Sequence, residues 1–250
     1  DERDRERLSQ TFLEQVNANQ PFRDIADFFA SIQYLHLVPQ LIREPDRSVG
    51  ITNDPYGGDF LERIARASLG TRTSRLRRIQ DALRVAVPQL SALELWRDPV
   101  SGTPHLRGKY EHWRAQGAWQ TEEQFSDGTL RLFGLLWAVL DGSGPILLEE
   151  PELSLHADVV RFVPQMLARV QRKSKRQLFV SSHSAEILDD PGIGLDEVLV
   201  LQPGDEGTTV QTLQGDDSVI ARLEHGHTLA DIVPAKTRPA NVEQLALLES

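Results

Sequence analysis

Two adjacent carboxylates follow the short apolar run 146–148, an arrangement that suits phosphoryl transfer. The end of a strand is where an open α/β sheet places its ligands. Glu149 can hold Mg²⁺, commonly through water, and Glu150 can orient and deprotonate an attacking water. The alternative is a surface pair of glutamates after a core strand, and the two residues by themselves favour neither interpretation.

A second candidate group, Ser126, Asp127 and Gly128, directly precedes the apolar stretch 129–140. If that stretch is a helix, its free N–H groups and its dipole attract an anion at this end. Gly128 lets a phosphate approach the backbone, and Ser126 offers a hydroxyl to the same phosphate. Taken alone, the group is better explained as an ordinary helix cap.

A histidine completes the candidate chemistry. His183 follows the apolar run 177–180, which predicts a strand next to the one that carries the two glutamates. An imidazole N–H at this place can contact a terminal phosphate. Taken alone, His183 is better explained as a loop histidine before a helix that Ser184 caps.

The elements that must position these residues form a recognisable order. An apolar strand at 146–148, a helix at 157–171 and a strand at 177–180 predict a βαβ unit. This unit predicts an α/β fold with a parallel sheet. The stretch 129–140 is apolar almost all round, which predicts a helix that is buried on most sides.

Periodicity predicts further elements elsewhere in the chain. They are a helix at 3–19, a strand at 31–38, two helices within 59–88, a hairpin of 92–96 with 105–109, and a hairpin of 198–202 with 209–213. Trp113 and Trp119 follow the first hairpin and are interpreted as core or lobe-packing residues.

Composition limits the classes of function. The chain has 27 Lys and Arg against 37 Asp and Glu, a net charge of −10, which argues against a nucleic-acid binder that uses its whole surface. One helix still offers a local basic patch with Arg72, Arg75, Arg77, Arg78 and Arg84, although a solvated helix face is the favoured interpretation. The lack of cysteine excludes disulfides, and no apolar run approaches the length of a membrane span, so we expect a cytoplasmic protein without membrane contact.

Taken in order, the segments resemble the second half of an ATP-binding-cassette ATPase. The segment 125–129 resembles the signature motif, 146–150 resembles Walker B with its catalytic glutamate, and His183 resembles the switch histidine. The sequence of residues 149–156 is similar to that of the soluble RecF, SMC and overcoming-lysogenization (OLD) proteins, a branch that is often labelled AAA-family. The resemblance implies an ABC-type P-loop NTPase core with an inserted helical lobe. It also implies three regions: 1–53 as the end of lobe I, 54–120 as the helical lobe with a small hairpin, and 121–250 as the rest of the core.

The chain departs from the family pattern in several places. The phosphate loop G-x-x-x-x-G-K-[ST] does not occur in the sequence. Because the sequence starts at Asp1 and its single methionine is Met166, we expect an upstream segment that carries this loop. Glu149 stands where the family has aspartate. Asp127 replaces a small residue and adds a negative charge near the expected phosphate.

Three residues stay without a firm role. Gln33 and Gln40 are candidates for the Q-loop glutamine but have no motif support. His156 follows the Walker B segment, and contact across a dimer interface and packing at a helix start are equally good interpretations.

The resemblance further implies a head-to-tail homodimer that ATP and Mg²⁺ hold together. Glu149, Glu150 and His183 of one chain would face Ser126 of the other. The implied work is on DNA or with an effector nuclease, in DNA repair or phage defence. The chain alone is expected to be inactive. Two alternatives stay open: an interaction module that no longer uses ATP, and a DNA-binding protein that uses the arginine-rich helix.

Overall fold

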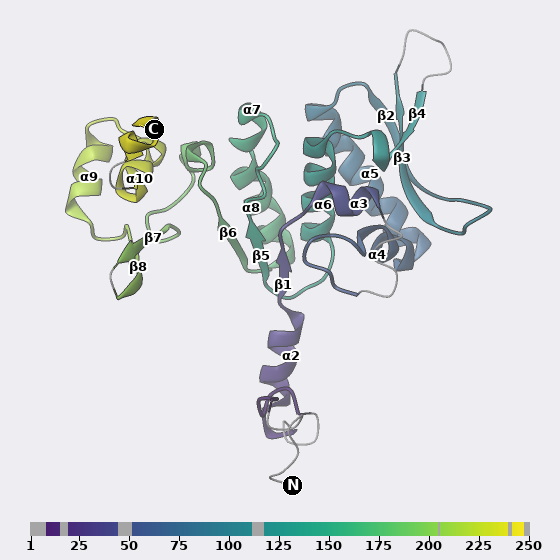
Figure 1. Ribbon diagram of the computed structural model, residues 1–250, viewed down its shortest axis with the longest axis horizontal. Helices are drawn as coiled ribbons and strands as arrows, with labels where there is room; N and C mark the ends of the chain where they lie inside the picture. The colour runs from purple at the N-terminus through teal and green to yellow at the C-terminus, as the bar shows by residue number, and fades with distance from the viewer. Residues whose placement is uncertain are drawn as a thin grey trace. The chain divides into compact units, whose positions relative to one another are not determined.

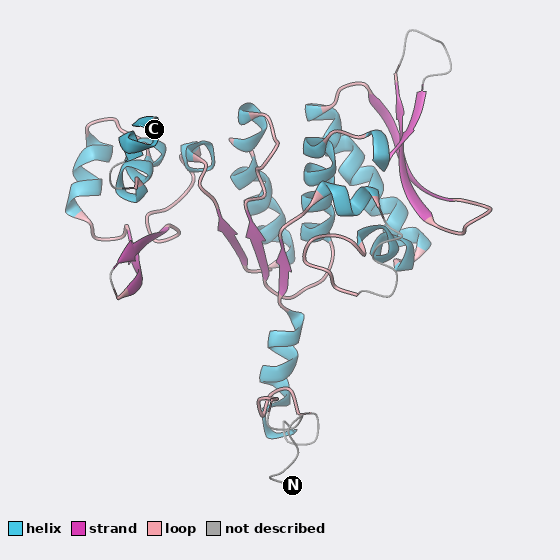
Figure 2. Ribbon diagram, viewed as in Figure 1, coloured by secondary structure: helices cyan, strands magenta, loops and turns pink. Residues whose placement is uncertain are grey.

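The computed structural model describes residues 9–15, 20–44, 52–111, 118–204, 206–239 and 242–247. These residues fall into two compact units, which are taken separately below (Figures 1 and 2). Unit 1 comprises residues 1–151 and 170–181, and unit 2 comprises residues 152–169 and 182–250. The division into 1–53, 54–120 and 121–250 stays a prediction.

Unit 1 contains the parallel sheet. Its strands are β1 (Gln33–Leu35), β5 (Ile146–Glu149) and β6 (Leu178–Ser181), in the order β1-β5-β6. Both pairings are parallel, and Glu149 lies opposite Ser181 in the register. Figure 2 shows the three strands side by side. The predicted α/β class with a parallel sheet is therefore confirmed.

The other elements of unit 1 include a second, separate sheet. In chain order they are η1 (Gln20–Phe22), α2 (Arg23–Ser31), α3 (Pro39–Arg43), α4 (Phe60–Arg66), α5 (Leu69–Ala86), β2 (Leu90–Arg97), β3 (Pro104–Tyr110), β4 (Ala118–Thr121), η3 (Glu122–Gln124) and α6 (Asp127–Leu140). The strands β2, β3 and β4 form an antiparallel sheet. Figure 1 shows α5 between α6 and this second sheet.

Helix α6 is the centre of unit 1. Ten of its residues are buried, among them Phe133 and Trp137 at 0% exposure, because the sequence is apolar on nearly every side of the helix. Gly134 lets the segment after β1 pack closely: a Cβ at this position would lie 2.3 Å from Cδ1 of Leu37. The predicted buried helix at 129–140 is confirmed.

The two faces of the parallel sheet differ in cover. Leu35, Ile146 and Leu148 are buried and point to the side of α6. Side chains alternate along a strand, so Tyr34 and Phe179 point to the opposite face. They are 43% and 45% exposed, and the described part of unit 1 therefore covers this second face incompletely.

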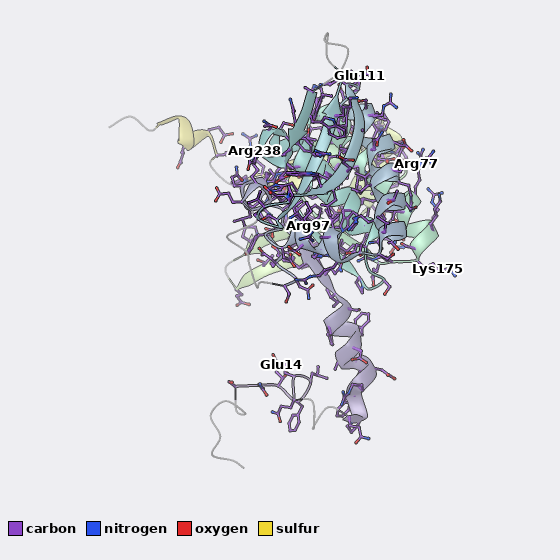
Figure 3. All side chains as sticks on the ribbon, turned by 90° about the vertical axis from the view of Figure 1, so that its right-hand side faces the viewer. Glu14, Arg77, Arg97, Glu111, Lys175 and Arg238 are labelled. Atoms are coloured by element: carbon purple, nitrogen blue, oxygen red, sulfur yellow. The ribbon has the colours of Figure 1, made fainter. Side chains whose placement is uncertain are left out.

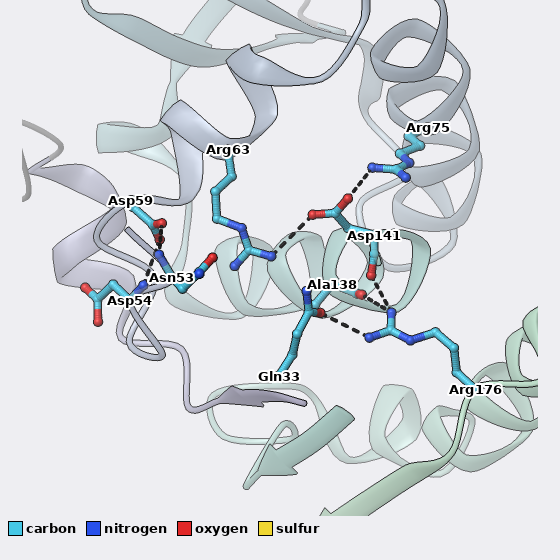
Figure 4. A network of polar contacts seen from close by, with 9 residues as sticks. All are labelled: Gln33, Asn53, Asp54, Asp59, Arg63, Arg75, Ala138, Asp141 and Arg176. Carbon is cyan, nitrogen blue, oxygen red and sulfur yellow. Dashed lines mark hydrogen bonds and ion pairs between the residues drawn. The ribbon is translucent and has the colours of Figure 1, made fainter. Parts of the chain in front are cut away.

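A buried arginine joins the end of α6 to the sheet. Arg176 is 2% exposed and donates to the backbone oxygens of Gly144 (2.7 Å), Ala138 (2.9 Å) and Asp141, and to Oε1 of Gln33 (3.1 Å). Burial lowers the pKa of Arg176, and the neighbouring Asp141 opposes this shift. Figure 4 shows the guanidinium group with its acceptors on Ala138, Asp141 and Gln33.

The side chain of Asp141 extends this network to two further helices. Its carboxylate accepts from Arg63 of α4 at 3.3 Å and from Arg75 of α5 at 2.7 Å (Figure 4). The guanidinium of Arg75 also lies over the ring of Trp137, 5.3 Å from its centre. The carboxyl end of α6 is thus fixed to α4, α5 and the start of β6 by charged groups.

Unit 2 has its own small core. Its elements are α7 (Ala157–Val160), the first part of α8 (Val163–Ser174), η4 (Ala185–Asp189), β7 (Leu199–Gly204), β8 (Gly207–Thr212), α9 (Asp217–Glu224), α10 (Leu229–Thr237) and η5 (Val242–Leu247). Val198, Val200, Leu213, Val219, Leu229 and Ile232 form the core. Asp216 caps α9 and pairs with Lys236 at 2.9 Å, and the hydrogen bond from Ser218 and this ion pair lower the pKa of Asp216 well below its usual range.

Both predicted hairpins and the two helices within 59–88 are confirmed, whereas three other predictions are wrong in part. The helix predicted at 3–19 is a turn over residues 9–15. The Glu14 carboxylate accepts from the backbone N–H and hydroxyl of Thr11, a contact that is typical of the start of a helix and not of its interior. The rest of that prediction, residues 3–8 and 16–19, lies outside the described residues.

The strand predicted at 31–38 is longer than the observed strand β1, for two reasons. Ser31 still belongs to α2, and its hydroxyl donates to the Phe28 carbonyl at 2.6 Å. After β1, the N–H groups of His36 and Val38 donate to residues 55 and 56 of a loop, instead of to a strand.

The helix predicted at 157–171 is divided into α7 and α8. Pro164 has no N–H to donate to the carbonyl of Val160, which favours a break at this point. Trp119 is 45% exposed on β4, which excludes the core interpretation for this residue, and Trp113 lies outside the described residues. None of the described helices is long and apolar enough to cross a membrane.

Candidate functional site

The carboxylate of Glu149 is held by two side chains from β1 and its continuation. The hydroxyl of Tyr34 donates to Oε2 of Glu149. Nδ1 of His36 lies 3.8 Å from the same oxygen and is buried without a hydrogen-bond partner among the described residues. Because residues two apart on a strand share a face, Tyr34 and His36 both lie on the face that Glu149 uses. The sequence interpretation missed both residues, which are more than 100 positions from Glu149 (115 for Tyr34).

A loop keeps His36 in this place. Its ring packs edge-to-face on Tyr56, with ring centres 6.2 Å apart, and its N–H donates to the Pro55 carbonyl at 2.9 Å. The loop itself is held by the buried carboxylate of Asp59, which accepts from the N–H of Asn53 at 2.6 Å (Figure 4). The position of His36 next to Glu149 is therefore built into the fold.

Glu150 has a strained backbone. Its φ is 42°, in the left-handed region that side chains other than glycine rarely adopt. Its N–H donates to the carbonyl of Ser181 at 2.9 Å, so the pairing of β5 with β6 extends one residue past β5. Such conformations cost on the order of 1–3 kcal/mol and are found preferentially at functional sites. The strain turns Glu150 out of the strand at the carboxyl edge of the sheet.

The site fits a magnesium ion only in combination with other ligands. No group of three or more potential metal ligands occurs among the described residues. Glu149 would supply one carboxylate oxygen, and Mg²⁺ in phosphoryl-transfer sites takes its remaining ligands from water and from phosphate oxygens. The unpartnered, buried Nδ1 of His36 next to this carboxylate is consistent with a further polar group at this place.

At the start of α6, Ser126 acts as a helix cap. Its hydroxyl oxygen accepts from the N–H of Thr129 at 3.2 Å and lies 2.8 Å from Oγ1 of that residue. The cap alternative is therefore what the structure shows for the side chain, while Ser126 stays exposed. Gly128 lies in the first turn, where the free N–H groups of the helix are found.

Asp127 is neutralised by an arginine that the sequence interpretation missed. Nη2 of Arg43 lies 2.6 Å from Oδ1 of Asp127 and donates to the carbonyl of Phe125 at 2.7 Å. Arg43 is the last residue of α3, which begins four residues after β1 ends. No local signal links two residues that are 84 positions apart.

The segment before α6 is fixed by a buried carboxylate. Glu122 is 0% exposed, accepts from the N–H of Leu106 at 2.8 Å, and lies 2.6 Å from Nδ1 of His105. Burial raises the pKa of Glu122, and the hydrogen bond with His105 opposes the shift. Since Ser126 follows only four residues later, this anchor on β3 fixes the entry to α6.

His183 belongs to unit 2, whereas the other predicted site residues belong to unit 1. It is exposed and follows β6 by two residues, and β6 is the strand next to β5 as predicted. The hydroxyl of Ser182 donates to the buried Glu152 and accepts from the N–H of Ser184 at 2.9 Å, so both neighbours of His183 are fixed. The Ser184 side chain makes no cap hydrogen bond to η4.

Several other residues that the sequence singled out for a function make contacts within their own unit. Nδ1 of His156 accepts from the N–H of Asp158 at 3.2 Å, which makes His156 the cap of α7. Gln33 binds Arg176 inside unit 1. On α5, Arg72 donates to the Ala65 carbonyl at 3.0 Å and Arg75 binds Asp141, so neither is available as part of a basic patch.

Comparison with known proteins gives one family and several structural neighbours. The model of the family described as "AAA domain, putative AbiEii toxin, Type IV TA system" matches residues 2–189. No curated protein matches the sequence.

Structures of SMC proteins are among the structural neighbours. A structure from work on ATP-driven dimerization and DNA stimulated activation of SMC ATPases is 14% identical, with a TM-score of 0.44, and the match covers 67% of this chain and 96% of that one. The Smc head of Pyrococcus furiosus bound to the C-terminal domain of ScpA is 16% identical at a TM-score of 0.44, over 61% and 38% of the two chains. An Smc head bound to the C-winged helix domain of ScpA is 15% identical at a TM-score of 0.45, over 70% and 60%.

Proposed function

Because the chain belongs to the AAA-domain family of putative AbiEii toxins, we propose that it forms part of an ATP-hydrolysing site of the ATP-binding-cassette type. The observation that carries this proposal is the end of β5. Two carboxylates stand there at the carboxyl edge of a parallel sheet, and the second one has a strained backbone.

We assign different roles to the two carboxylates. Glu149, held by Tyr34 and placed near His36, is the residue that would bind Mg²⁺, which neutralises phosphate charge when bound. Glu150 leaves the strand immediately afterwards and is the general base that orients the attacking water. The exposed His183 follows the neighbouring strand and is assigned to the terminal phosphate.

The exposed start of α6 is assigned to the nucleotide of a second copy. Ser126 and Gly128 present the free N–H groups of a helix start, which bind anions. In the proposed head-to-tail homodimer, this helix start of one chain closes on ATP that the carboxylates of the other chain hold. The cellular setting that we propose, with DNA or an effector nuclease in repair or phage defence, rests on the family resemblance alone.

A phosphate loop must come from elsewhere, and the sheet has room for it. β6 is one of the two edge strands of the described sheet, and its residues Phe179 and Val180 are 45% and 38% exposed. Parallel sheets are normally covered on both faces, and exposed apolar edges are unfavourable. We propose that a further strand carrying the phosphate loop pairs with β6 and that the segment after it covers the face of Phe179.

The chain as printed should hydrolyse no ATP, because its sequence has no phosphate-loop motif to cradle the β-phosphate. The complete protein, with a phosphate loop, should hydrolyse ATP in a Mg²⁺-dependent manner. The test is steady-state phosphate release from both, with EDTA as the control. Turnover by the 250 residues alone that depends on Glu150 would contradict this part of the proposal.

A second candidate function is supported by the exposed arginines of α5. Arg77, Arg78 and Arg84 are exposed on this helix, and Figure 3 shows Arg77 at the surface. DNA phosphates bind such groups with an affinity that falls as salt rises. If α5 binds DNA, replacing the three arginines with Ala should weaken binding at low salt about tenfold or more and reduce the salt slope.

Fluorescence anisotropy with labelled duplex DNA measures this effect. The matched control replaces Arg169, Lys173 and Lys175, which are exposed basic residues outside α5. Arg75 is not suitable for this test, since its loss would break the ion pair with Asp141. Equal weakening by the control variant would indicate non-specific charge attraction and would exclude α5 as the binding surface.

A further inference from the structure

The pair of Arg43 and Asp127 lies directly at the start of α6. Both contacts of Arg43 use Nη2, which bonds the Asp127 carboxylate at 2.6 Å and the Phe125 carbonyl at 2.7 Å. The Arg43 side chain is 21% exposed, and the Asp127 side chain is 39% exposed. Phe125 itself is buried at 3%. The guanidinium is therefore anchored to a fixed point of the backbone, in contrast to a loose ion pair on the surface.

Arg43 is also fixed from its own side. It ends α3, a short helix in which Pro39 and Ile42 are buried. An exposed ion pair usually loses stability because two mobile side chains must be ordered to form it. This entropy cost is smaller where the fold already orders one of the side chains. The backbone of Arg43 is thus fixed by α3 and its guanidinium by the Phe125 carbonyl, and both contacts hold it next to Asp127.

Asp127 poses an electrostatic problem for the proposed function. It is the first residue of α6, between Ser126 and Gly128, which we assign to a nucleotide phosphate. A carboxylate in the first turn stabilises the helix itself through the dipole, but it repels a phosphate that approaches the same turn. A like charge at an interface costs affinity unless another group compensates it.

We infer that Arg43 is a positioning residue of the nucleotide site, which compensates the Asp127 carboxylate so that the start of α6 can close on a phosphate. This inference rests on the proposed function. Arg43 acts through Asp127 and does not itself bind the nucleotide. The pair thus preserves the anion affinity of a helix start that carries an acidic residue.

A double-variant cycle tests this role in the complete protein. Self-association is measured by sedimentation velocity with and without a non-hydrolysable ATP analogue and Mg²⁺, for the wild type, Arg43→Ala, Asp127→Ala and the double variant. Arg43→Ala should weaken nucleotide-dependent pairing about tenfold, because it leaves the carboxylate uncompensated. Asp127→Ala should pair at least as well as the wild type, and the double variant should lie within about twofold of Asp127→Ala.

Two controls separate charge from structure. Arg43→Lys keeps a positive charge on a side chain of similar length, so it should retain most of the pairing that Arg43→Ala loses. Lys236→Ala breaks a comparable ion pair with Asp216 in unit 2 and should leave pairing unchanged.

The possible outcomes distinguish the inference from the proposed function. Pairing that stays weak in the double variant means that Arg43 acts independently of Asp127, and the inference is then wrong while the proposed function stands. Unchanged pairing of Arg43→Ala has the same meaning. If the self-association of the wild type is the same with and without the ATP analogue, the proposed function is wrong, and the inference that rests on it is wrong as well.

Discussion

Replacing Glu150 with Gln in the complete protein should reduce ATP turnover by a factor of about 100 to 10,000, which is the usual contribution of a general base. Glutamine has nearly the same shape as glutamate but accepts no proton at neutral pH. The φ of 42° at this position is equally unfavourable for either residue, so the fold should be retained. Loss of one negative charge near the phosphates should at the same time prolong the ATP-bound pair.

The measurement combines steady-state ATP hydrolysis with sedimentation in the presence of ATP and Mg²⁺. The matched control is Glu111→Gln, the same change at an exposed residue beyond β3 (Figure 3), and it should leave turnover unchanged. Turnover of Glu150→Gln within about threefold of the wild type would exclude Glu150 as the base. It would shift the search for the base to other residues of the sheet edge.

Replacing Arg176 with Met should lower the free energy of unfolding of unit 1 by about 3–5 kcal/mol. Methionine fills a similar volume but donates no hydrogen bond. The carbonyls of Ala138 and Gly144 then lose a charged donor, and each buried acceptor left without a partner costs about 1–3 kcal/mol. Arg176→Lys should recover only part of this loss, because one ammonium group cannot reach acceptors that a planar guanidinium serves in several directions.

Urea unfolding followed by tryptophan fluorescence reports this effect selectively. Trp96, Trp119 and Trp137 lie in unit 1, and the sequence has no tryptophan within 152–169 or 182–250, so the signal follows unit 1 and not unit 2. The control is Lys173→Met, an exposed residue of α8 whose loss should change the stability by less than about 0.5 kcal/mol. A loss below about 1 kcal/mol for Arg176→Met would show that the network in Figure 4 does not stabilise unit 1.

Sequence patterns predicted the elements that depend on near neighbours in the chain. The apolar run that became β5, the buried helix α6 and the two hairpins all follow from periodicity or from turn residues, which act over a few positions. The same reasoning failed where a local signal was overlooked. The lack of an N–H at Pro164 is visible in the sequence and favours the break between α7 and α8.

The partners of the candidate site could not be predicted in this way. Tyr34 meets Glu149 across 115 positions, and Arg176 meets Gln33 across 143. No periodicity connects residues at such separations, because their contact depends on the order of strands in the sheet. The exposure of Trp119 is a similar case, since only the placement of β4 decides which side of it is covered.

The sequence by itself determined the class of the fold, the family and the choice of Ser126, Glu150 and His183 as candidates, because residue types and their order carry this information. Only the tertiary structure decided what surrounds them: the strained backbone of Glu150 and the compensation of Asp127 by Arg43. The physical reason is that a motif specifies which groups are present. Their charge balance and backbone conformation depend on groups that folding brings from distant parts of the chain.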